Sequence, residues 1–64
     1  MPTQAQVEKA ITYLAPNALV SEIAALVVSS GAGWRNQLTT YLMAPTITRR
    51  QRIAVLAAVS AIAE

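Results

Sequence analysis

Residues 48–64 of the chain read TRRQRIAVLAAVSAIAE, and this segment decides the fold that the rest of the sequence has to complete. Thr48 and Gln51 have the spacing of a capping box, in which two side chains accept hydrogen bonds from each other's backbone amides at a helix start. Beyond them, Ser60 is the only polar residue from Ile53 to Ala63. A helix that is apolar on every side is normally buried on every side. The segment therefore predicts a C-terminal helix that needs neighbours all round it.

The large and the small apolar residues of this helix alternate around it. About half of its surface is covered by Ile53, Val55, Leu56, Val59 and Ile62, and the rest by Ala54, Ala57, Ala58 and Ala61. Small side chains allow a second helix to approach closely. We therefore expect self-association through Ala54, Ala57, Ala58, Ala61, Leu56, Val59 and Ile62. The alternative is that alanine, the best helix former, simply tolerates exposure.

The chain has 64 residues, 55% of them hydrophobic and 12% charged, and it contains no cysteine and no histidine. A chain of this length buries only about 60% of the surface that it exposes when unfolded. Neither a disulfide nor a usual zinc site can add stability. The predicted fold is all-α: one helical domain over residues 1–64, a small bundle of about four short helices that homo-oligomerisation completes.

The N-terminal segment carries the same start signal as the C-terminal one, because Thr3 and Gln6 also have capping-box spacing. Apolar residues then recur along one helix face at Val7, Ala10, Ile11 and Leu14. The residue before a proline is pushed out of helical geometry. Pro16 therefore predicts that this helix ends near Leu14 or Ala15.

A second helix is expected from Ala18 to Ser30, with Asn17 as its N-cap and Gly31 just past its end. One face of this helix is apolar and consists of Leu19, Val20, Ile23, Leu26 and Val27. Valine lowers helix propensity, so a buried strand over residues 24–28 is the alternative. The 3.6-residue period favours the helix.

A third helix is expected from Trp34 to about Met43, after a turn at residues 31–33 and before Pro45. Its apolar stripe consists of Trp34, Leu38, Tyr41 and Leu42, which predicts that both rings face the core. Stacking of the rings on bases is the alternative. A helix-turn-helix reading of this region is weakened because its recognition helix carries a single cation, Arg35, whereas duplex binding needs several phosphate contacts.

The basic residues gather at the start of the last helix, where Arg49, Arg50 and Arg52 oppose the helix dipole. The simplest interpretation is that they keep an apolar helix end soluble, with their stems packed on apolar neighbours. The alternatives are that they bind an acidic protein partner, or a phosphate-bearing ligand such as a nucleotide, RNA or DNA. Together with Arg35, they are the candidate anion-binding or partner-binding residues.

Catalytic and metal-binding residue types are scarce. The chain has no histidine, cysteine or aspartate and only three glutamates, so we expect no enzymatic activity, no cofactor and no metal site. The predicted function is a non-enzymatic protein-interaction module, a structural or regulatory adaptor that acts as a homo-oligomer. The alternatives are a binder of phosphate-bearing ligands and a membrane-active helical peptide.

The sequence contains a single lysine, which argues against the membrane-active peptide because such helices usually carry a lysine-rich polar face. The apolar stretch from Ile53 to Ala63 falls short of the ~20 residues that span a bilayer. The N-terminal residues lack the basic and apolar pattern of a secretory signal peptide, so a cytoplasmic location is expected.

Overall fold

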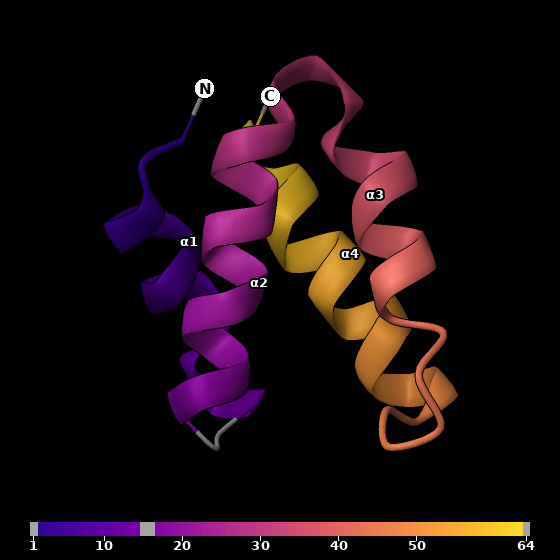
Figure 1. The fold of residues 1–64 in the computed structure, drawn as a ribbon. Coiled ribbons are helices and arrows are strands. Elements are labelled where there is room, and N and C mark those ends of the chain that lie inside the picture. Colours follow the sequence, from indigo (N-terminus) through magenta and orange to yellow (C-terminus); the bar gives the residue numbers. More distant parts are fainter. Residues whose placement is uncertain (1, 15–16, 64) are drawn as a thin grey trace.

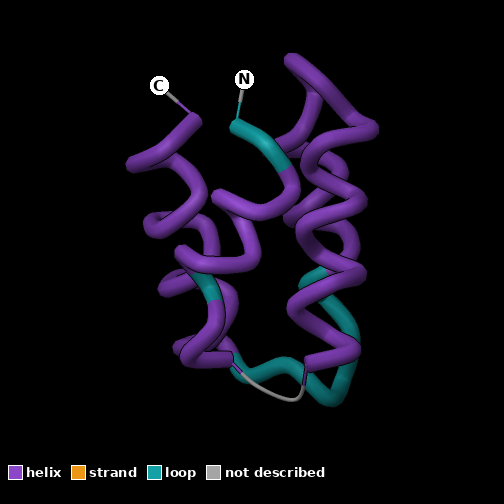
Figure 2. The backbone as a smooth tube through the Cα atoms, turned by 90° about the vertical axis from the view of Figure 1, so that its left-hand side faces the viewer, coloured by secondary structure: helices purple, strands orange, loops and turns teal. Residues whose placement is uncertain are grey.

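The computed structural model describes residues 2–14 and 17–63, and these residues form helices joined by turns, without a strand (Figures 1 and 2). The α-helices are α1 (Gln4–Ala10), α2 (Asn17–Ser30), α3 (Trp34–Tyr41) and α4 (Arg49–Ala63), with short 3-10 turns η1 (Thr12–Leu14) and η2 (Gly31–Gly33). The predicted all-α class is confirmed. The strand alternative over residues 24–28 is wrong, because these residues belong to α2.

The helices pack around one centre. Neighbours along the chain lie together, α1 against α2 and α2 against α3, and α4 returns to contact both α1 and α3. The start of α1 and the end of α4 therefore lie at the same end of the molecule (Figure 1). The molecule measures 28 × 21 × 17 Å along its principal axes.

Both predicted capping boxes are present. The backbone amide of Thr3 donates to Gln6 Oε1 at 2.8 Å, and the amide of Gln6 donates to Thr3 Oγ1 at 3.2 Å. The corresponding bonds between Thr48 and Gln51 measure 2.9 and 3.1 Å. Each box satisfies amides that a helix start otherwise leaves without a partner.

The end of the first helix differs from the prediction. The α-helix stops at Ala10, and the chain tightens into η1, where the Leu14 amide donates to the Ile11 carbonyl at 2.9 Å. Pro16 has no amide hydrogen to donate to the carbonyl of Thr12, four residues earlier, so the regular helical bonding cannot continue there. The predicted end at Ala15 lies outside the described residues.

Two other boundaries also moved. The second helix begins at Asn17, one residue earlier than predicted, and the side chain expected to cap it lies outside the described part of the chain. The third helix ends at Tyr41 rather than near Met43, because the amides of Met43 and Ala44 turn to carbonyls three residues back, at 3.3 and 3.4 Å.

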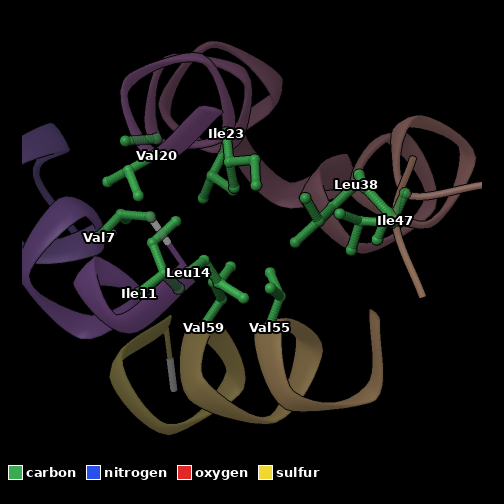
Figure 3. Packing of buried hydrophobic residues seen from close by; sticks show 12 residues of the cluster. Val7, Ile11, Leu14, Val20, Ile23, Leu38, Ile47, Val55 and Val59 are labelled. Atoms are coloured by element: carbon green, nitrogen blue, oxygen red, sulfur yellow. The ribbon is translucent and has the colours of Figure 1, made fainter. Parts of the chain in front are cut away.

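A continuous core joins all the α-helices (Figure 3). Its buried members are Val7, Ile11, Leu14, Val20, Ile23, Ala24, Val27, Leu38, Leu42, Ile47, Val55 and Val59. The apolar stripes predicted for the first two helices supply six of these residues. The accessible surface of 4079 Å² is close to the roughly 4,000 Å² expected of a folded monomer of this mass. One chain thus encloses its own core, and the case for self-association has to rest on its surface.

Gly31 ends α2 in the left-handed conformation, with φ of +58°, as the sequence predicts. We expect Gly31→Ala to lower the free energy of unfolding by about 1 kcal/mol, because an L-residue is strained there. A Cβ at this position would meet nothing within 4 Å, so backbone strain alone is measured. Urea denaturation followed by circular dichroism gives the value.

Gly33→Ala is the matched control. Gly33 has φ of −88° and equally open surroundings, so alanine there should leave stability unchanged or raise it slightly. Equal stability of the two variants would contradict the assigned role of Gly31.

Candidate functional site

The helix α4 has one side buried in the core and another side that exposes apolar residues to solvent. Val55 and Val59 point from α4 into the core and are fully buried (Figure 3). On the opposite side, Ile53 is 57% exposed; Ile62, which follows Val59 by three residues and so lies on the side of the two valines, is 37% exposed near the helix end. We define the α4 outer face as the exposed residues on the side away from the two valines: Arg49, Arg50, Ile53, Ala57 and Ala61.

The residues predicted for self-association do not share one surface. Ala57 and Ala61 lie on the α4 outer face, Ile62 is exposed near the end of the valine side, and Ala54, Leu56 and Ala58 are half-buried. Leu56 and Ala58 pack against the core of the chain itself. Val59 is fully buried in that core. Its assignment to an interface is wrong, because its side chain is not accessible to a second molecule.

Ile53 was missed as an interface candidate, although it is the most exposed large apolar residue of α4. It lies one helical turn before Ala57, which in turn lies one turn before Ala61. With Arg49, Arg50 and Ala54, it lines an open depression of ≈ 540 Å³. Two arginines thus border an apolar floor, and all four lining residues belong to α4.

The three arginines at the start of α4 do not form one patch. Arg49 and Arg50 are exposed on the outer face. Arg52 is half-buried, and its Nη1 donates to Met43 Sδ at 3.5 Å. Its guanidinium therefore lies against the loop before α4.

Arg35 is also separate from these arginines. Its guanidinium carbon lies 5.0 Å from the centroid of the Trp34 ring, and its Nη2 donates to Ser60 Oγ on α4. Ser60 follows Arg52 by eight residues, about 12 Å along the helix axis at 1.5 Å per residue. The predicted basic set is therefore two exposed arginines on α4 and two that contact other parts of the chain.

The carboxylates that the structure describes make hydrogen bonds to residues other than Arg49 and Arg50. Glu8 accepts from Gln4 Nε2 at 3.1 Å, and Glu22 accepts from the Tyr41 hydroxyl at 2.5 Å. The first turn of α4 contains no acidic residue. The start of the α4 outer face is therefore positively charged.

Trp34 and Tyr41 both pack against the core and are half-buried, in agreement with the predicted apolar stripe of the third helix. The hydrogen bond from Tyr41 to Glu22 ties α3 to α2. This bond, together with burial and the neighbouring negative charge, raises the pKa of Tyr41 to about 12.

The residues that the structure describes contain no group of three or more histidine, cysteine, aspartate or glutamate side chains that could hold a metal ion. No helix within residues 2–14 and 17–63 combines the length and the apolar character needed to cross a bilayer.

In comparisons with known proteins, no family model, no curated protein and no solved structure matches this chain. The geometry of the chain itself is therefore the basis of the functional proposal.

The link between Tyr41 and Glu22 predicts a dependence of stability on alkaline pH. The pKa of Tyr41 is higher in the folded chain than its ordinary value of 10.0, so the hydrogen bond stabilises the fold fully at any pH below about 10. This stabilisation is lost as the pH rises from about 10 to about 12. In a Tyr13→Phe variant Tyr41 is the only tyrosine, so tyrosinate absorbance should report a midpoint near 12.

Adding Glu22→Gln to that variant provides the control, since it removes the carboxylate acceptor. The midpoint of the tyrosine titration should then fall toward 10.0. The free energy of unfolding at neutral pH, measured with urea, should also fall, by up to about 1 kcal/mol. Identical titrations of the two variants would show that the bond does not form.

Proposed function

We propose that this chain is a non-enzymatic helical protein-interaction module, a structural or regulatory adaptor of the cytoplasm, that acts as a homo-oligomer through the α4 outer face. In this proposal a second copy covers the apolar outer side of a small helical bundle whose own core is already closed. The observation that carries the proposal is the 57% exposure of Ile53 on a stripe with exposed Ala57 and Ala61.

Burial of this stripe would be favourable. Each Å² of apolar surface removed from water contributes about 25 cal/mol. Ile53 is the large apolar side chain of the stripe, and the apolar residues that follow it there are alanines. Ala57 and Ala61 leave room for the axis of another helix to approach to about 8 Å. The stripe is thus suited to helix packing rather than to binding a small polar molecule.

Arg49 and Arg50 support a second candidate, a binder of phosphate-bearing ligands at the start of α4. Guanidinium groups form paired hydrogen bonds with phosphate oxygens, and both side chains are exposed. Two observations favour the protein partner. The depression that the two arginines line is otherwise lined by the apolar residues Ile53 and Ala54, and the Gln51 amide of the first turn already donates to Thr48.

Sedimentation equilibrium over a concentration series tests the proposed function, with Ala57→Glu as the variant. We expect the mass of the parent chain to rise above 6.8 kDa with concentration, and the variant to remain at the monomer mass while its circular dichroism is unchanged. A charged side chain at Ala57 must be dehydrated when a partner packs on it.

Ala25→Glu is the matched control, because Ala25 is an exposed alanine within α2. This variant should associate like the parent. A parent chain that keeps the monomer mass at every concentration, or an Ala57→Glu variant that associates normally, would contradict the proposal.

The phosphate candidate makes a different prediction. Retention of the parent on a polyphosphate column should fall steeply with salt, and the double variant Arg49→Ala/Arg50→Ala should not be retained. Equal retention of parent and double variant would remove this candidate.

A further inference from the structure

The exposed residues of α4 have the spacing of a seam between two helices. Arg50, Ile53, Ala57 and Ala61 follow one another at intervals of three, four and four residues, which places them along one side of the helix. In the sequence Arg50 precedes Ala57 by seven residues, and seven-residue spacing keeps side chains on the same seam of paired helices. Ile53 and Ala61 lie four residues to either side of Ala57, which is therefore the centre of the apolar part of the stripe.

Side-chain size along the stripe distinguishes the possible directions of a second α4. Ile53 and Ala61 are equally far from Ala57, on opposite sides of it. In an antiparallel pair centred on Ala57, each Ile53 would lie opposite the partner's Ala61, so a large residue meets a small one twice. In a parallel pair, each Ile53 would meet its own copy and the alanines would face each other, which leaves the spacing between the helices uneven.

The distribution of charge along α4 also favours an antiparallel pair over a parallel one. Arg49 and Arg50 lie in the first turn of α4, and the last turn contains no basic residue. The helix dipole adds positive charge at the start of a helix and negative charge at its end. A parallel pair would bring two basic starts together, whereas an antiparallel pair brings each basic start to the negative end of the other helix.

We propose that the partner of the α4 outer face is a second copy of this chain, packed antiparallel about a two-fold axis at Ala57, with Ile53 against the partner's Ala61 and Arg50 at the end of the partner's α4. This arrangement rests on the proposed function and specifies its geometry. A two-fold interface of this kind closes on itself, so the assembly stops at the dimer.

Disulfide cross-linking tests the direction of the pair, because the chain contains no cysteine of its own. A disulfide needs Cβ atoms about 3.5–4.5 Å apart. A mixture of Ile53→Cys and Ala61→Cys proteins should form the mixed cross-linked dimer on mild oxidation, whereas Ile53→Cys alone should not cross-link. Efficient cross-linking of Ile53→Cys with itself, and none in the mixture, would overturn the antiparallel arrangement in favour of the parallel one.

Charge reversal tests the direction of the pair independently. Arg50→Glu should weaken dimerisation roughly tenfold, because it places a negative charge at the negative end of the partner's α4. Lys9→Glu is the control, since Lys9 is an exposed cation on α1 and its reversal should leave dimerisation unchanged.

The outcomes separate the two proposals. A parent chain that stays monomeric removes both. Concentration-dependent association that Ala57→Glu abolishes, combined with an unchanged dissociation constant for Arg50→Glu and no mixed cross-link, removes the antiparallel arrangement alone and leaves the proposed function standing.

Discussion

Val55 and Val59 of α4 close the core of this chain, and the rest of the structure depends on their burial. They share one buried cluster with side chains of α1, α2 and α3 (Figure 3). Since α4 is apolar nearly all round, burial of one side turns another apolar side outward. The exposure of Ile53, Ala57 and Ala61 is thus a consequence of how the core is closed. Because the core is already complete, association on the outer face would add to a stable fold and would be reversible.

Local rules predicted much of this fold. Two capping boxes, the glycine after the second helix and the apolar stripes of the first two helices are found where the sequence places them. Each of these signals depends on residues within one or two helical turns, so neighbouring elements cannot easily overrule it. The exact ends of the first and third helices were less predictable, because short 3-10 and turn bonds compete there with the regular helix.

The functional face was harder to predict than the fold. A helix that is apolar on every side has no period that tells its inner side from its outer side, and for this reason Val59 was wrongly assigned to the surface and Ile53 was overlooked. One signal was present: the side of the helix that carries Arg50 continues through Ile53 and Ala57, and a charged residue favours the side that faces water. Ile47 lies in the loop before α4 and enters the core without belonging to any helical pattern.

Backbone amide chemical shifts measured over a dilution series show whether the α4 outer face packs against a second molecule. We expect concentration-dependent shifts for residues 49–62 that saturate together, while the amides of α2 stay constant. Spectra that do not change on dilution, or changes that lie on α2 while α4 remains constant, would contradict this packing.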